Sequence, residues 1–466
     1  MSIGNEPVIR VGLMTAAREI RFAISGAFID ADGKAVKEGA YAASSENGAV
    51  RLQGETASTT SAIKLTPTDF DSCRFTVQGV KIGLNFHWER EESQQFQGTL
   101  GIEAGSDGLT LINELPLESY LVSVISSEMS ASCPPEFLRA HSIVSRSWLL
   151  AQLHKRARTL LNTLAQLHKR HPSLLKPKEG APGPSTASDA ELIRWYDRES
   201  HRDFDVCADD HCQRYQGISK AFSQAAFDAA RDTRGRVLVY GDDVCDARYS
   251  KSCGGMTEIY SAVWEDEDVP YLKPVYDGPG SEAPGHRLPL SVEVNAEDWI
   301  SSSPLAYCGM VTSDLVARIL PGFDQETRDF YRWEIDYSQE ELNEILRTRL
   351  GIDFGRVRAL VPLDRGESGR IIKLKIAGEK RTLVIGKELE IRRALSKSHL
   401  YSSAFIVQAS REQASDYPTR FKLIGAGWGH GVGLCQIGAA VMADRGHGHE
   451  EILAHYFAGV EISALY

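Results

Sequence analysis

The stretch YLVSVISSEMSASCPPEFLRAHSIVSRSW, residues 120–148, decides how the chain folds around its most informative residue, Glu128. A helix is predicted from Leu117 to Ser127, because apolar residues recur there with helical spacing: Leu117, Leu121, Val124 and Ile125. A second helix is predicted from the Pro134-Pro135 pair, since proline suits a first helical turn. Its apolar stripe is Phe137, Ala140, Val144 and Trp148. Glu128 therefore lies at a break between helices.

A carboxyl at such a break, partly out of water, can have a raised pKa and donate a proton. The alternative for Glu128 is a solvated surface side chain. Arg139 and Arg146 lie two turns apart on another face of the second helix, so guanidinium groups are expected close to the carboxyl.

Length and composition exclude several classes of protein. The chain has 466 residues, 42% of them hydrophobic and 25% charged, which is ordinary for a globular protein of two or three domains. A net charge of -11 argues against a general nucleic-acid binder. Charges within residues 1–25 leave no room for a signal-peptide core, and no stretch is long enough for a membrane span. Either the protein is cytoplasmic or an export signal lies outside this sequence.

The predicted fold class is α+β, with a β-rich core, a catalytic helix pair, a helical insertion and a smaller α+β subdomain lining a cleft. Five segments follow from the patterns: 7–148, β-rich with the helix pair; 149–200, a basic helical insertion and linker; 201–284, a metal-binding and Gly-Gly segment; 285–400, α+β; and 401–466, rich in glycine.

The insertion carries AQLHKR twice, at 151–156 and 165–170, an offset of about four turns that keeps both copies on one helix face. We expect a surface helix here; the alternative is contact with an anionic polymer. The composition of Pro177–Ser188 predicts a mobile loop.

The segment HRDFDVCADDHCQRYQG places His201, Cys207 and Cys212 within about a dozen residues. Thiolates and imidazole are ligands suited to Zn²⁺. Water or another side chain would complete a tetrahedron, and the adjacent His211 could substitute for a ligand. The alternative is a pair of free thiols beside a surface histidine. The eight cysteines are otherwise too scattered for a disulfide scaffold.

Two glycine-rich segments follow, YSKSCGGMTE (Tyr249–Glu258) and GWGHGVGLCQIG (Gly427–Gly438). The first can form a wall of a binding cleft, because paired glycines let backbone approach a ligand. A covalent alternative makes Cys253 a nucleophile with His430 as its base. The second lacks the lysine and hydroxyl of a phosphate loop. It predicts either a compact loop facing a groove or a tight structural turn.

Taken in order, these motifs resemble the SpoIID/LytB family. The helix pair, the aromatic-x-x-Ser-x-Gly-Gly segment with its following Trp and Pro-Tyr-Leu, and the GWGHG half match from about Val8 to Ile462, outside the basic insertion. The resemblance implies a lytic transglycosylase that cuts the bond between N-acetylmuramic acid and N-acetylglucosamine in peptidoglycan strands stripped of stem peptides. The product would carry a 1,6-anhydro-muramic end.

The resemblance also implies roles for single residues. The family's catalytic Glu falls on Glu128, and its zinc ligands fall on His201, Cys207 and Cys212, with the zinc expected to be structural. Substrate contacts would come from a set in the helix pair and the glycine-rich segments: Arg146, Tyr249, Ser250, His430 and Gln436. The chain departs from the family at His141, Cys253 and Leu434-Cys435.

The expected partners are peptidoglycan strands and a cell-wall amidase, with an extracytoplasmic location. The second role known in the family is that of an amidase enhancer, which binds the wall or a partner without catalysis. A third alternative is a zinc-dependent or cysteine-dependent peptidase.

Overall fold

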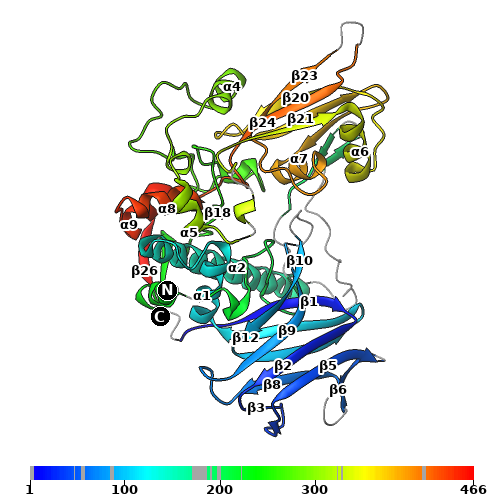
Figure 1. Ribbon diagram of the computed structural model, residues 1–466, viewed down its shortest axis with the longest axis vertical. Helices are drawn as coiled ribbons and strands as arrows, with labels where there is room; N and C mark the ends of the chain where they lie inside the picture. Colours follow the sequence, from blue (N-terminus) through cyan, green and yellow to red (C-terminus); the bar gives the residue numbers. More distant parts are fainter. Residues whose placement is uncertain are drawn as a thin grey trace. The chain divides into compact units, whose positions relative to one another are not determined.

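The computed structural model describes residues 5–46, 48–53, 58–83, 89–169, 186–188, 191–196, 201–221, 223–322, 324–326, 329–411 and 416–466. The chain divides into two compact units. Unit 1 comprises residues 1–157, 200–237 and 462–466, and unit 2 comprises residues 158–199 and 238–461. The mixed α+β class predicted from the sequence is confirmed (Figure 1). The predicted segment 201–284 contributes to both units.

Unit 1 contains two large sheets, as the β-rich pattern of its first part predicts (Figure 1). The first has the strand order β15-β1-β12-β11-β8-β3-β4. Its strands are β1 (Val8–Ala17), β3 (Phe28–Ile29), β4 (Ala35–Val36), β8 (Ala62–Pro67), β11 (Thr99–Gly105), β12 (Gly108–Pro116) and β15 (Val206–Cys207). The second has the order β10-β9-β2-β5-β6-β7. Its strands are β2 (Glu19–Ser25), β5 (Gly39–Glu46), β6 (Ala49–Gln53), β7 (Ser58–Thr60), β9 (Arg74–Ile82) and β10 (Arg90–Phe96).

The core of unit 1 follows from alternation along these strands. In β2, Ile20, Phe22 and Ile24 are buried while their neighbours are less so, as a strand with one face toward the core requires. Phe75 and Phe96 stack at a ring separation of 5.3 Å within the same core. The burial of large aromatic side chains is a main source of stability here.

The predicted helix pair is confirmed in position. Helix α1 (Leu117–Glu128) ends at Glu128 itself, and α2 (Pro135–Lys169) begins at the proline pair. Most of α1 is buried, and short elements η1 (Gly217–Ser219) and α3 (Gln224–Asp232) complete the helices of unit 1.

Helix α2 continues without a break into the region predicted as an insertion, so the first AQLHKR copy extends the second helix of the pair. Most of the loop predicted at Pro177–Ser188, and Arg170 of the second copy, lie outside the described residues. Its last three residues are instead β13 (Thr186–Ser188), which pairs with β14 (Glu191–Ile193). Strand β14 pairs in parallel with β22, so the end of the predicted linker belongs to a sheet of unit 2.

Unit 2 is built on a five-stranded sheet, β13-β14-β22-β21-β20, and a three-stranded sheet, β19-β24-β23. Their remaining strands are β19 (Arg332–Ser338), β20 (Val357–Arg365), β21 (Ile371–Gly378), β22 (Thr382–Gly386), β23 (Phe405–Ser410) and β24 (Arg420–Ala426). The short strands of unit 2 are β17 (Asp243–Val244), β18 (Tyr249–Ser250) and β25 (Leu434–Cys435), while β16 (Arg236–Tyr240) and β26 (Glu461–Ala464) each have residues in both units.

The helices of this part are η2 (Tyr260–Ala262), α4 (Glu293–Ser301), η3 (Tyr307–Gly309), α5 (Ser313–Ile319), η4 (Asp324–Glu326), α6 (Gln339–Leu350), α7 (Glu388–Ala394), α8 (Gln436–Asp444) and α9 (His449–Tyr456). A capping box begins α6, because Ser338 Oγ accepts from Glu341 N and the Glu341 carboxylate accepts from Ser338 N. Gly351 ends this helix in the left-handed conformation.

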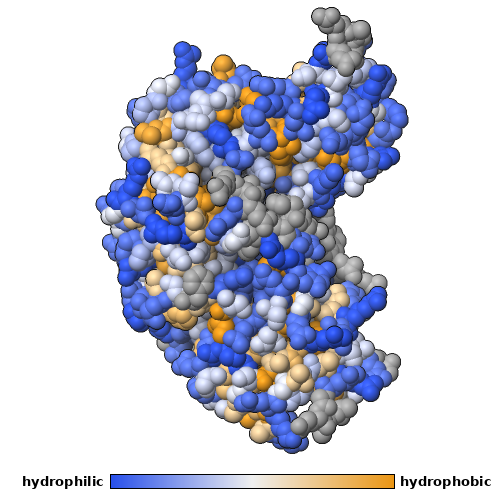
Figure 2. Space-filling view, in the orientation of Figure 1, coloured by the Kyte–Doolittle hydropathy of each residue, from blue (hydrophilic) through white to orange (hydrophobic). Residues whose placement is uncertain are grey.

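Two apolar clusters of described residues lie in the core of unit 2. One gathers α6 and α7 against the five-stranded sheet, and the other gathers α4 and the strands β23 and β24. On the face in Figure 2, hydrophobic residues form separate patches among hydrophilic ones. None of the helices in the described part of the chain has the length and hydropathy needed to span a membrane.

Candidate functional site

Glu128 is held inside unit 1 at the C-terminal end of α1. Its side chain is 8% exposed, so it is not the solvated surface glutamate of the alternative. One carboxylate oxygen accepts a hydrogen bond of 2.9 Å from the backbone N–H of Arg214. A buried carboxyl with a fixed donor has a defined orientation, which proton transfer to a bound substrate requires.

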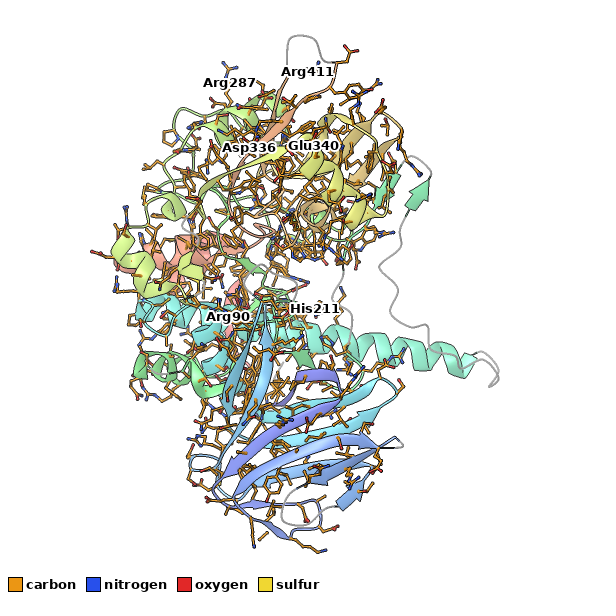
Figure 3. The ribbon with its side chains drawn as sticks, turned by 45° about the vertical axis from the view of Figure 1, so that its right-hand side comes forward. Arg90, His211, Arg287, Asp336, Glu340 and Arg411 are labelled. Atoms are coloured by element: carbon orange, nitrogen blue, oxygen red, sulfur yellow. The ribbon has the colours of Figure 1, made fainter. Side chains whose placement is uncertain are left out.

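The four side chains His201, Cys207, His211 and Cys212 gather into one cluster, the His/Cys cluster, whose ligand atoms all lie within 4.8 Å of one another. The three residues predicted as metal ligands are therefore brought together. His211, considered only as a substitute for one of them, joins as a fourth group. It is the exposed member of the cluster and is labelled in Figure 3.

The spacing of these atoms matches a tetrahedral metal site. Cys212 Sγ lies 3.3 Å from His201 Nε2 and 3.5 Å from His211 Nδ1, and Cys207 Sγ lies 3.8 Å from His211 Nδ1. A tetrahedron with metal–sulfur bonds of about 2.3 Å and metal–nitrogen bonds of about 2.05 Å has N–S edges of ~3.5 Å. Two histidines and two cysteines leave no open position, which is typical of structural sites.

The electrostatics of the cluster also favour a cation. The neighbouring Cys212 thiol, followed by burial, raises the pKa of Cys207 far above its usual range. Two thiolates this close repel each other in a partly buried site, so a cation is needed to hold both deprotonated.

The surrounding elements fix the His/Cys cluster from two sides. Strand β15 pairs in parallel with β1, with Cys207 opposite Gly12, so one ligand extends the seven-stranded sheet. Arg156 of α2 donates to the backbone oxygens of Phe204 and Arg202 at 3.0 and 3.1 Å. Arg156, the final residue of the first AQLHKR copy, therefore holds the loop that carries the ligands in place.

The segment directly after the cluster carries the donor to Glu128. Tyr120 of α1 donates to Gln213 Oε1 at 3.0 Å, and Tyr215 donates to Asn113 at 2.5 Å. The Tyr120 and Tyr215 rings stack at 5.3 Å. These contacts fix residues 213–215 against α1 and β12, so the ligand loop and the Glu128 carboxyl are parts of one packed structure.

Arg146 has a different environment from the one expected of a sugar-binding residue. Its side chain is fully buried in unit 1 and donates to both carboxylate oxygens of Glu118, at 3.0 and 2.6 Å. It also donates to the Arg236 carbonyl at 2.8 Å. The contact between Arg146 and a sugar stays a prediction, one that this burial does not favour.

Unit 2 brings the two glycine-rich segments together. Strand β18 pairs in parallel with β25, placing Tyr249 opposite Leu434 and Ser250 opposite Cys435. The buried Arg370 ties the segments further, since its guanidinium donates to the carbonyls of Cys253 and Gly429 at 3.0 to 3.2 Å. Arg370 directly precedes β21, and no local pattern in the sequence indicated this contact.

His430 is held by backbone contacts within this assembly. Its Nδ1 accepts from Val432 N at 3.0 Å, and its ring meets that of Trp264 edge-on at 4.9 Å. Burial, then Arg248 and other guanidinium groups, lower the pKa of His430 well below its usual range, against a backbone hydrogen bond with Tyr249. The lowered pKa favours the neutral imidazole, and these contacts fix the orientation of its ring within the glycine-rich loop.

The other predicted substrate contacts of unit 2 differ in exposure. Tyr249 and His430 are partly exposed, while Ser250 and Gln436 are 6% and 2% exposed. Cys253 is buried, and burial raises its pKa well above the usual range. A thiol in that environment is a poor nucleophile, which argues against the covalent alternative.

Sequence reasoning missed a second group of possible ligands in unit 2. Cys253, Asp277, Cys308 and Cys435 are all buried, and their ligand atoms lie within 4.8 Å of one another. Cys207 and Cys212 are close in sequence, whereas the members of this second group meet only in the folded chain. No short-range signal could have found this group, because its members come from four distant segments.

Comparison with known proteins gives two family matches and several relatives. Residues 105–240 match a family described as Stage II sporulation protein (SpoIID), and residues 258–433 match a domain of unknown function (DUF8618).

Stage II sporulation protein D of Bacillus amyloliquefaciens is 24% identical over 353 residues, covering 76% of this chain and 75% of the relative. The protein of the same name from Bacillus subtilis (strain 168) is 23% identical over 354 residues, 76% of each chain. An amidase enhancer of that strain is 22% identical over 238 residues, 51% of this chain and 32% of the relative.

Proposed function

This chain carries a domain of the SpoIID family, as its motifs predicted, and we propose that it is a lytic transglycosylase of peptidoglycan. Its substrate would be glycan strands stripped of stem peptides, cut between N-acetylmuramic acid and N-acetylglucosamine. The product would carry a 1,6-anhydro-muramic end.

One observation carries the proposal: the buried side chain of Glu128 ends α1 and accepts a hydrogen bond from Arg214 N. The matched SpoIID region, residues 105–240, contains this glutamate, its donor and the His/Cys cluster. The proposal therefore rests on residues that lie within one unit and one family match.

The chemistry requires one carboxyl group that acts twice. Protonated Glu128 would donate its proton to the glycosidic oxygen as the bond to the anomeric carbon breaks. The resulting carboxylate would then take the proton of the sugar's own 6-hydroxyl as that oxygen attacks the anomeric carbon. The attacking group belongs to the substrate, so the second carboxylate of a hydrolytic pair is not needed.

We propose that the His/Cys cluster binds Zn²⁺ through His201, Cys207, His211 and Cys212. Two thiolates and two imidazoles suit this ion, and four protein ligands make its role structural. The ion would neutralise the thiolates and fix the loop, while residues 213–215 hold Arg214 N at the carboxyl of Glu128.

Sugar contacts by Tyr249 and His430, both partly exposed in unit 2, stay predictions of the family resemblance. Since the substrate is a cell-wall polymer, we expect the protein to act outside the cytoplasm.

The test is incubation with denuded glycan strands and analysis of the products by mass. We expect 1,6-anhydro-muramic ends, and a fall of about 100-fold or more in rate for Glu128→Gln, the usual contribution of a general acid–base. Glu340→Gln is the control, because Glu340 is exposed on α6 (Figure 3). Absence of anhydro ends, or full activity in Glu128→Gln, would refute the catalytic role.

The match to an amidase enhancer supports a second candidate, a non-catalytic module that binds the wall and stimulates an amidase. This function predicts stimulation of amidase activity that is unchanged in Glu128→Gln. The activities of Glu128→Gln on glycan strands and on the amidase therefore distinguish the two candidate functions.

A further inference from the structure

The second group of buried ligand-type side chains lies inside unit 2 and has no part in the proposed reaction. We propose that Cys253, Asp277, Cys308 and Cys435, the Cys₃Asp cluster, form a second metal site that holds Zn²⁺ or a similar thiophilic divalent cation. The four ligand atoms lie within 4.8 Å of one another, and the side chains are 0 to 2% exposed. This site is independent of the proposed catalytic function.

The sulfur spacing fits a metal better than a disulfide. Cys253 Sγ and Cys308 Sγ lie 3.9 Å apart. A tetrahedral site with zinc–sulfur bonds of about 2.3 Å has S–S edges of ~3.8 Å. A disulfide requires a separation of about 2.05 Å, so these sulfur atoms have the spacing of two ligands on one ion.

Hydrogen-bond donors point at the ligand atoms, as they do around protein-bound metals. Cys435 Sγ accepts from Cys253 N at 3.2 Å and from Gly438 N at 3.4 Å, and Cys253 Sγ accepts from Gly255 N at 3.4 Å. Such donors stabilise thiolates and orient them toward an ion.

Asp277 is held in the same way. Its carboxylate accepts from Tyr456 Oη at 2.6 Å and from Cys308 N at 3.1 Å. Gly438 leaves the room it needs, because a Cβ there would come within 2.4 Å of the Asp277 carboxylate oxygen. A glycine at the start of α8 thus lets the carboxylate approach the helix.

Positive charge surrounds the segment that carries the first ligand. The buried Arg370 donates to the Cys253 carbonyl, and Arg332 donates to the Gly254 carbonyl at 3.1 Å. Cys435 is the N-cap of α8, where the helix dipole favours a thiolate. These groups offset the excess negative charge that three thiolates and a carboxylate would leave around a divalent ion.

The ion would join four segments that are distant in sequence. They are the loop after β18, the segment following Tyr276, the short helix η3 and the junction of β25 with α8. Both glycine-rich segments belong to this set. The site would therefore stabilise unit 2 by cross-linking the backbone near Tyr249 and His430, a structural role.

The test is the zinc content of the full chain purified without chelator, measured by elemental analysis. We expect about two equivalents per chain, one for each cluster, and about one in Cys308→Ser. Cys245→Ser is the matched control, since Cys245 is equally buried in unit 2 outside the cluster, and it should keep both equivalents. Loss of one equivalent in Cys308→Ser but not in Cys245→Ser supports the site. An equal metal content in all three proteins overturns it.

A second measurement covers the possibility that Cys308→Ser does not fold. The variant Cys207→Ser/Cys212→Ser should still bind about one equivalent of Co²⁺, with the charge-transfer absorption of thiolate ligands. If it lacks that absorption while its circular dichroism matches that of the parent, the site is refuted. Asp277→Asn in this background should weaken the binding of Co²⁺, because a carboxylate ligand is removed.

Discussion

The two clusters of metal-binding side chains are assembled in opposite ways. The His/Cys cluster of unit 1 comes from one short segment, residues 201–212, and includes an exposed histidine. The Cys₃Asp cluster of unit 2 comes from four segments, with Cys253 separated from Cys308 by 55 residues and from Cys435 by 182. The first site has all its ligands on one segment that can open locally, whereas the buried site requires most of unit 2 to be in place.

This difference has a thermodynamic consequence. Local opening of a loop costs far less free energy than global unfolding, so groups held by one loop exchange with solvent more readily than groups in a core. Metal in the His/Cys cluster would therefore be held mainly by its ligands. Metal in the Cys₃Asp cluster would be held by the stability of the whole unit.

The largest expected effect is on the rate of metal release. With a chromophoric chelator in excess, the native protein should release zinc in two phases whose rates differ by ~1000-fold or more, because the second requires opening of the core. The fast phase should be absent from Cys207→Ser/Cys212→Ser. A single fast phase containing all the metal would show that burial of the Cys₃Asp cluster does not protect it.

The same comparison explains what the sequence reveals. The helix pair could be predicted because apolar residues recur at helical spacing between Leu117 and Trp148. The metal-binding loop could be predicted because His201, Cys207 and Cys212 are close in sequence. Both signals are local. The joining of Cys253 with Cys435 depends on the pairing of β18 with β25, which no periodicity in either segment encodes.

Arg146 shows what a local pattern does not reveal about a charged side chain. A guanidinium near a candidate acid suggests a substrate contact, yet its partner Glu118 lies on α1 and its carbonyl acceptor belongs to Arg236, 90 residues further along the chain. Whether a charged side chain faces a ligand or the core is decided by such tertiary partners. Sequence spacing alone could not supply them.

The second prediction concerns the contribution of the buried Arg146–Glu118 pair to the stability of unit 1. Arg146→Met should lower the free energy of unfolding by about 3–5 kcal/mol, because Glu118 loses its buried partner. Arg139→Met, on the same helix, is the control. Its side chain is 26% exposed and its ion pairs should contribute about 1 kcal/mol or less. Urea denaturation measures both, and equal losses would contradict the structural role of Arg146.

The smallest expected effect concerns the coupling between the His/Cys cluster and Glu128. Cys212→Ser should lower kcat on glycan strands by about 10- to 100-fold, the usual effect of disturbing groups around a metal site, because Arg214 N would lose its fixed position at the carboxyl. Asp203→Asn is the control, since Asp203 is exposed on the same loop. KM should change little, because Arg214 N acts on the Glu128 carboxyl and is not a proposed sugar contact. A variant that loses its zinc but keeps its kcat would show that the His/Cys cluster does not contribute to catalysis. The packing of Tyr120 against Tyr215 would then be the feature that positions Arg214 N at Glu128.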